Sequence, residues 1–170
     1  MRRLAIVVAA IGLLAGLYLG TRHYPPKSSH AGPSVTLPAM TDLNGHVIGQ
    51  ASYNRKVVLI NFWAAWCTPC RAEIPQFIAL QEKYGNQGLQ IIGISMEDSE
   101  LALRKFYQEA KMNYPVVVGN QQIAQACGGV LGLPTTYLVG RDGHVRGKLV
   151  GSTDFHDLER QITALLQQSR

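Results

Sequence analysis

Two cysteines separated by two residues, Cys67 and Cys70, stand between an apolar run and an amphipathic run. The apolar run, 57–63, has the length and near-continuous hydrophobicity of a strand buried on both faces. The residues after Cys67 predict a helix that ends near Tyr84, before Gly85. Two thiols at this spacing can close into a disulfide within one helical turn. A strand–dithiol–helix unit favours an α/β fold and indicates redox chemistry.

The position of Cys67 at a helix start predicts that it is the exposed nucleophile of the pair. A helix N-terminus carries partial positive charge and unpaired N–H groups, which stabilise a thiolate. Cys70 lies one turn further on, where we expect it to be shielded and to resolve a mixed disulfide with Cys67. A structural disulfide is the alternative, but two-residue spacing closes too small a loop to add much stability.

Other uses of the cysteines have less support in the sequence. Zinc would need two more ligands with their own spacing, and the five histidines form no second short pair. Covalent haem attachment would need histidine where Arg71 stands. We therefore expect no metal and no cofactor. The third cysteine, Cys127, lies near the end of a short predicted helix, and we interpret it as a small buried residue and not as a regulatory or resolving thiol.

The N-terminus predicts export and membrane attachment. Arg2 and Arg3 precede an uncharged apolar run, and a helix over residues 4–20 would span roughly 25 Å, slightly less than the hydrocarbon core of a bilayer. Its end offers no good small-x-small cleavage site, so we expect an uncleaved signal anchor at 1–20 in preference to a cleaved signal. A Pro/Ser/Gly-containing linker, 21–33, would join this anchor to one exported domain, 34–170.

Charge gives no sign of nucleic-acid binding. Four of the chain's 16 basic residues lie before residue 28, which leaves 12 basic and 11 acidic residues in the rest. The high pI of about 9.3 therefore reflects the N-terminus and not a basic binding surface.

The rest of the chain alternates predicted strands and helices. The Asn44–Gly45 pair predicts a hairpin between 35–37 and 46–48, and Asp142–Gly143 predicts another between 135–139 and 144–150. Further strands are expected at 89–95 and 114–118, and further helices at 99–110, 121–126 and 155–166. The fold class is thus α/β, with a mixed central sheet flanked by helices and an N-terminal β-hairpin.

Two segments carry a family resemblance. Residues 61–75, with the sequence NFWAAWCTPCRAEIP, and residues 132–139, GLPTTYLV, resemble the thioredoxin superfamily. The closer similarity is to its membrane-anchored exported branch, the TlpA/ResA/CcmG-like thiol–disulfide oxidoreductases. The N-terminal hairpin and an inserted strand–helix segment, about 89–118, also fit that branch. The resemblance covers roughly 35–167 and implies a thioredoxin-like fold.

The resemblance implies roles for individual residues. Cys67 matches the attacking thiol and Cys70 the resolving thiol. Pro134 matches a proline with a cis peptide bond beside the active site, which would leave the N–H and C=O of Leu133 free to pair with an extended client segment. Trp66, next to Cys67, is expected to belong to the apolar surface on which the client docks.

One position departs from thioredoxin itself. Thioredoxin has a buried aspartate six residues before its first cysteine, where this chain has Asn61. An amide cannot accept a proton at neutral pH, so proton transfer must fall to another residue. Glu73, one turn after Cys70, matches a carboxylate of the exported branch and is the expected substitute. The alternative is an ordinary acidic residue near a helix start.

The expected activity is thiol–disulfide exchange through Cys67 and Cys70, most readily the reduction of disulfides in exported proteins such as apocytochrome c. The implied partners are client proteins with disulfides or dithiols and a membrane electron donor of the DsbD/CcdA type. The implied location is the cytoplasmic membrane, with the catalytic domain in the periplasm or outside the cell. A dithiol oxidase or isomerase and a non-catalytic thiol- or metal-binding chaperone remain alternatives. A peroxidase is a weaker one, because the expected peroxide-cleaving pattern is absent.

Overall fold

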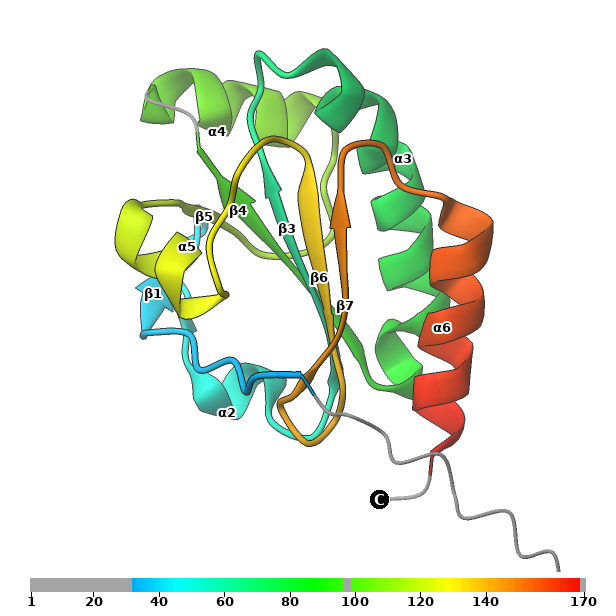
Figure 1. Ribbon diagram of the computed structural model, residues 1–170. Helices are drawn as coiled ribbons and strands as arrows, with labels where there is room; N and C mark the ends of the chain where they lie inside the picture. The colour runs from blue at the N-terminus through cyan, green and yellow to red at the C-terminus, as the bar shows by residue number, and fades with distance from the viewer. Residues whose placement is uncertain (1–31, 97–98, 169–170) are drawn as a thin grey trace, which may run out of the picture. The chain divides into compact units, whose positions relative to one another are not determined.

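A five-stranded mixed sheet forms the centre of the fold in the computed structural model, which describes residues 32–96 and 99–168. The strand order is β5–β4–β3–β6–β7 (Figure 1). The strands are β3 (Val57–Trp63), β4 (Leu89–Ser95), β5 (Val116–Val118), β6 (Thr135–Val139) and β7 (Val145–Val150). Because β3 is parallel to β4 and antiparallel to β6, the sheet is mixed, as predicted.

Both faces of this sheet are covered, which explains why all seven residues of β3 are buried. Side chains of β3 alternate between two core clusters, with Leu59 and Trp63 in one and Ile60 and Phe62 in the other. The first cluster packs under α3 (Thr68–Tyr84), α4 (Glu100–Glu109) and α6 (Phe155–Gln167). The second packs under α5 (Gln121–Ala126) and the segment that begins at Val35.

Three of the helices begin where a polar side chain can cap them. Ser99, Asn120 and Asp154 precede α4, α5 and α6, and each side chain accepts a backbone N–H of the first turn. The predicted helices 99–110, 121–126 and 155–166 are confirmed to within one residue at each end. The caps explain where these helices begin, although the predictions rested on apolar spacing and on the glycines after 121–126.

The N-terminal hairpin is confirmed, but its predicted first arm was wrong. The arm that pairs with β2 (Val47–Ile48) is β1 (Met40–Thr41), and not 35–37. Asp42 closes the turn tightly, because its carboxylate accepts the N–H groups of both Asn44 and His46. A turn this short pairs only the residues directly beside it. Val35 instead donates its N–H to the carbonyl of Gly143 in the distant β6–β7 turn.

Two smaller differences have local causes. The strand expected over 114–118 begins only at Val116, because the preceding Pro115 has no N–H to donate to a neighbouring strand. One short helix, α2 (Gln50–Tyr53), was not predicted, since a single turn leaves no periodic pattern in the sequence.

The expected signal anchor, 1–20, and nearly all of the expected linker, 21–33, lie outside the described residues. Among the residues that the structure does describe, none of the helices combines the length and the hydrophobicity needed to span a bilayer.

Candidate active site

Cys67 and Cys70 lie where β3 passes into α3, at the end of the sheet that is uppermost in Figure 1. Their sulfur atoms form a disulfide, with an S–S distance of 1.98 Å and Cα atoms 5.3 Å apart. Cys67 is the N-cap of α3, and its Sγ accepts the N–H of Cys70 at 3.3 Å. The same N–H would stabilise a thiolate on Cys67 in the reduced form, so the cap geometry supports its predicted role as nucleophile.

The two cysteines do not differ in exposure as predicted. Cys67 is 5% exposed and Cys70 is 2% exposed, so both are buried in the disulfide form. The expectation of an exposed Cys67 is therefore wrong for this state, in which Cys67 belongs to the first core cluster, together with Cys70, Ile74 and Phe77. The assignment of Cys67 as the attacking thiol stays a prediction and rests on its position at the helix N-terminus.

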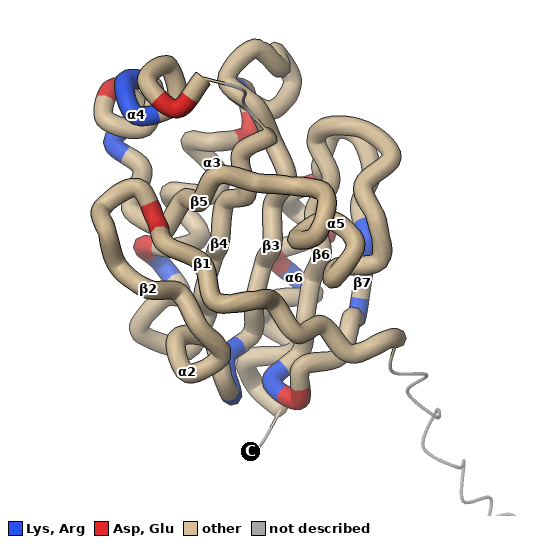
Figure 2. The backbone as a smooth tube through the Cα atoms, turned by 90° about the vertical axis from the view of Figure 1, so that its left-hand side faces the viewer, with Lys and Arg blue, Asp and Glu red and all other residues tan. Residues whose placement is uncertain are grey.

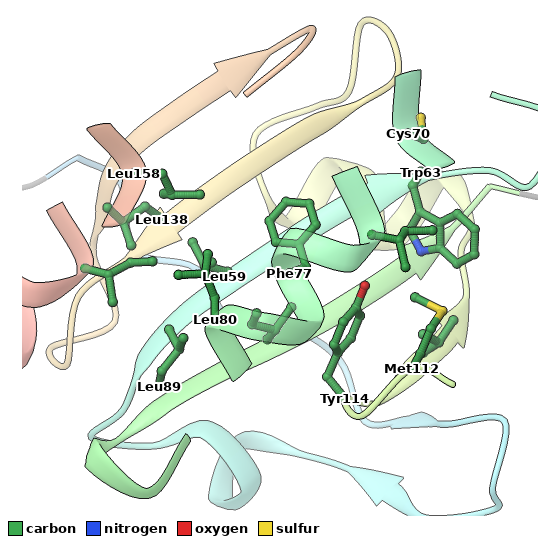
Figure 3. Packing of buried hydrophobic residues seen from close by; sticks show 14 of the residues in the cluster. Leu59, Trp63, Cys70, Phe77, Leu80, Leu89, Met112, Tyr114, Leu138 and Leu158 are labelled. Carbon is green, nitrogen blue, oxygen red and sulfur yellow. The ribbon is translucent and has the colours of Figure 1, made fainter. Parts of the chain in front are cut away.

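Cys70 lies at one end of a continuous apolar cluster under α3. Figure 3 shows Cys70 and Trp63 at that end and Leu89 at the other, with Phe77 between. An apolar environment of this kind disfavours a charged thiolate, whereas the helix N-terminus favours one. The two sulfur atoms are therefore in different electrostatic environments, although both are buried.

Glu73 is a buried carboxylic acid on the same face of α3 as Cys70, one helical turn further on. Its Oε1 accepts the backbone N–H of Thr153 at 2.5 Å, and its Oε2 has no hydrogen-bond partner among the described residues. Burial raises the pKa of Glu73 above its ordinary value, and the Thr153 N–H opposes that rise. An acid with a raised pKa and one open oxygen can give and take protons nearer to neutral pH.

Thr153 is a site residue that sequence reasoning missed. It lies in the loop between β7 and α6, 80 positions from Glu73 in the chain. Its hydroxyl Oγ1 is buried without a hydrogen-bond partner in the described part of the chain. No local pattern marks such a residue, because its place depends on how β7 ends at the same edge of the sheet as β3.

Asn61 occupies the middle of β3 and is buried. Its amide Nδ2 donates to the hydroxyl of Thr136 at 3.0 Å, directly across the β3–β6 ladder. Where thioredoxin has an aspartate, this chain thus has an uncharged residue, Asn61, whose side chain is hydrogen-bonded to Thr136. Apart from Glu73, the described residues contain one buried carboxylate, Asp42, which is engaged in the β1–β2 turn.

The peptide bond between Leu133 and Pro134 is cis, as predicted. Pro134 is buried and its carbonyl accepts the N–H of Gly151, whereas Leu133 is half-buried. Neither the N–H nor the C=O of Leu133 forms a hydrogen bond with another described residue. A client backbone could therefore pair with Leu133, which stays a prediction.

The strand register brings Leu133 and Pro134 to the dithiol end of the sheet. Thr135, the first residue of β6, lies opposite Phe62, one residue before the end of β3. The two residues before β6 and the residues after β3 therefore emerge at the same edge. Trp66 is also there, with 65% of its surface exposed, as expected for a docking residue.

Cys127 is separated from this site by the sheet. It is 2% exposed and packs in the second core cluster, beside Ile123, whereas the dithiol packs in the first. Burial raises the pKa of the Cys127 thiol to about 12, so it stays protonated at neutral pH. This environment supports the interpretation of Cys127 as a core residue.

Within residues 32–96 and 99–168, no three side chains of the His, Cys, Asp or Glu type lie close enough together to hold a metal ion. The groups that the described site itself offers are two sulfur atoms that can exchange a disulfide, a carboxylic acid that can exchange a proton, and an open backbone segment.

Comparisons with known proteins identify the family of this chain. The sequence profile of the AhpC/TSA family matches residues 29–148. The thiol-disulfide oxidoreductase ResA of Geobacillus kaustophilus is 31% identical over 164 residues, which are 95% of this chain and 91% of that protein.

Two solved structures from Chlorobium tepidum are similar to this chain in both fold and sequence. A protein assigned as thiol:disulfide interchange protein DsbE is 30% identical, with a TM-score of 0.74 over 80% of this chain and 97% of that chain. A thiol:disulfide interchange protein of the thioredoxin family is 26% identical, with a TM-score of 0.73 over 81% and 97%. With its CxxC pair at the start of α3, the chain therefore belongs to the AhpC/TSA family of the thioredoxin superfamily and is a thiol–disulfide oxidoreductase of the ResA/DsbE type.

Proposed function

We propose that this oxidoreductase is anchored in the cytoplasmic membrane, faces the extracytoplasmic side and reduces disulfides in exported proteins, apocytochrome c among them. Arg2 and Arg3 before the apolar run 4–20 support the anchor and its orientation. A membrane dithiol protein of the DsbD/CcdA type would return electrons to the Cys67–Cys70 disulfide after each turnover.

The reaction proceeds in two exchange steps. The Cys67 thiolate attacks one sulfur of the client disulfide, so the client S–S bond breaks and a Cys67–client bond forms, while the released client sulfur takes up a proton. Cys70 then loses its proton and attacks Cys67, which releases the second client sulfur as a thiol. The client gains two electrons and two protons, and the Cys67–Cys70 pair becomes the disulfide.

Glu73 is the observation that carries the reductive direction. A carboxylate near a thiol disfavours the thiolate, so it raises the thiol pKa values. A dithiol whose thiolate is strongly stabilised is a strong oxidant, and the converse holds for a dithiol that lacks this stabilisation. A buried Glu73 one turn from Cys70 therefore makes the pair more reducing. With its raised pKa, Glu73 also accepts the proton that Cys70 must lose in the second step.

The test is the redox state of Cys67 and Cys70 in growing cells, trapped by acid quenching and alkylation with a mass tag. A reductase is expected to be mostly in the dithiol form, because its electron donor recharges it. A pair found mostly as the disulfide would overturn the reductive direction and assign an oxidase. A Cys67→Ser/Cys70→Ser variant that keeps full cellular function would instead assign a binding role.

A further inference from the structure

We propose that the end of the sheet opposite the dithiol carries a binding pocket for a phosphate-type oxyanion. Three cations, Arg55, Lys56 and Arg141, line a pocket of about 380 Å³ together with the turn 85–88. The remaining polar side chains that line it are carboxamides, and none of the described residues that line it is acidic. In Figure 2, blue segments gather beside α2 at this lower end of the view.

Topology brings the three cations together. Arg55 and Lys56 directly precede β3, and Gly88 directly precedes the parallel strand β4. Arg141 follows the end of β6, which runs antiparallel to β3, so all of these positions meet at one edge. Cys67 follows the other end of β3, and a strand of this length spans roughly 23 Å. The pocket is therefore separate from the redox site.

The Arg141 guanidinium is held in place without being neutralised. Its nitrogen atoms donate to the carbonyl oxygens of Arg55 at 2.9 Å and of Gln87 and Leu166 at 3.3 Å each. Its Nε is buried with no hydrogen-bond partner in the described part of the chain. Carbonyl oxygens orient a guanidinium but leave it with a full positive charge, and such a preorganised charge suits an anion.

The backbone conformation at Gly88 and Arg55 leaves room for the Arg141 guanidinium. At Gly88 the φ angle is +103°, and a Cβ there would lie 3.1 and 3.2 Å from the two terminal nitrogens of Arg141. Arg55 has a φ angle of 61°, in the left-handed region that is unfavourable for a residue other than glycine. In this conformation the carbonyl of Arg55 accepts a hydrogen bond from Arg141, and both residues line the pocket.

The other charges nearby do not neutralise the cluster. The ammonium of Lys56 donates to the carboxamide of Gln90 at 3.2 Å, and no described carboxylate lies within ion-pair distance of Arg55, Lys56 or Arg141. Asp142, the neighbour of Arg141 in the chain, is paired with Arg146 at 2.5 Å. Three cations that no described carboxylate pairs with can recognise a phosphate group through charge-assisted hydrogen bonds.

Two sources could supply this phosphate, a lipid headgroup and a soluble phosphate ester. Both sources present charged phosphate oxygens, which the three cations could bind in the same way.

The pocket is tested by titrating inorganic phosphate into the full chain in phosphatidylcholine nanodiscs at constant ionic strength, with amide chemical shifts as the readout. We expect saturable shifts at residues 55–56 and 86–88. Arg55→Gln/Lys56→Gln should weaken phosphate binding at least about tenfold. The matched control Lys105→Gln/Lys111→Gln removes two exposed cations elsewhere and should leave the phosphate affinity unchanged. Both variants should reduce a client disulfide at the wild-type rate.

Nanodiscs that contain phosphatidylglycerol distinguish the sources. If a lipid headgroup occupies the pocket, these nanodiscs produce the same shifts without phosphate and compete with it; an unchanged phosphate affinity assigns a soluble phosphate ester. The proposal is overturned if phosphate produces no saturable shift at these residues, or if the Arg55→Gln/Lys56→Gln variant binds phosphate as tightly as the control.

Discussion

The three cysteines of this chain occupy two contrasting environments. Cys67 and Cys70 lie at an end of the sheet, at the N-terminus of α3, with Glu73 one turn away. Cys127 lies at the end of α5 in the opposite core cluster, where burial raises its pKa to about 12. All three are at most 5% exposed, so exposure alone does not distinguish them. Position at a helix N-terminus therefore distinguishes the dithiol from the third thiol, and we propose that the neighbouring acid tunes the pair.

The largest effect should come from the dithiol itself. Either Cys67→Ser or Cys70→Ser should lower client disulfide reduction by about a thousandfold or more, the scale expected when a covalent nucleophile is removed. Only Cys70→Ser should accumulate mixed disulfides with clients, because it retains the attacking thiol and lacks the resolving one. Non-reducing gels of cell extracts provide the measurement. Adducts on Cys67→Ser alone would reverse the two roles.

Removing the acid should have the next largest effect. Glu73→Gln is expected to slow turnover by about a hundredfold, because Cys70 loses its proton acceptor. The alkylation rate of Cys67 should also become less dependent on pH near neutrality. Glu82→Gln, on the exposed side of α3, is the matched control and should change neither quantity. If Glu73→Gln behaves like this control, Glu73 is only an ordinary acidic residue near the start of a helix.

The same variant should be more stable above the pKa of Glu73. The folded-state pKa is raised, so the protonated acid favours folding; this contribution is complete below the unfolded pKa near 4.5 and is lost as pH rises through the folded pKa. Glu73→Gln avoids burying a charge. Its melting temperature should therefore exceed that of the wild type at neutral pH and approach it under acidic conditions. A gain of equal size at both pH values would contradict this assignment.

The hydrogen bond between Asn61 in β3 and Thr136 in β6 should contribute to stability and not to proton transfer. Thr136→Val leaves the buried Asn61 amide without its partner, which should cost about 1–3 kcal/mol of unfolding free energy. Denaturant unfolding measures the loss. The pH profile of alkylation at Cys67 should stay as in the wild type, and a shifted profile would show that Asn61 and Thr136 contribute to the redox site.

The smallest effect is expected at the third cysteine. Cys127→Ala removes one buried sulfur atom and should cost about 1 kcal/mol of stability, with unchanged turnover. Thermal unfolding and a client reduction assay check the two parts. A loss of turnover larger than the loss of folded protein would give Cys127 a redox function and remove the contrast between the two environments.

The central fold and the dithiol could be predicted from the sequence because they depend on local patterns. The run 57–63 and the capped helices show their structure in the spacing of apolar and polar residues, and Cys67 stands at the junction. The hairpin arm at 35–37 was misassigned because Val35 bonds to Gly143, far along the chain, and not to the β2 arm. Thr153 was missed for the same reason: the contact with Glu73 exists only after β7 has paired with β6.

The roles of Cys67, Cys70 and Glu73 together make one central claim, that the pair is a reductant tuned by a buried acid. The reduction potential of the full chain, equilibrated against glutathione buffers at neutral pH, tests it most directly. The account predicts a potential below that of the glutathione couple, and a higher potential for Glu73→Gln. A wild-type potential close to about −120 mV, where strong dithiol oxidants lie, would contradict it.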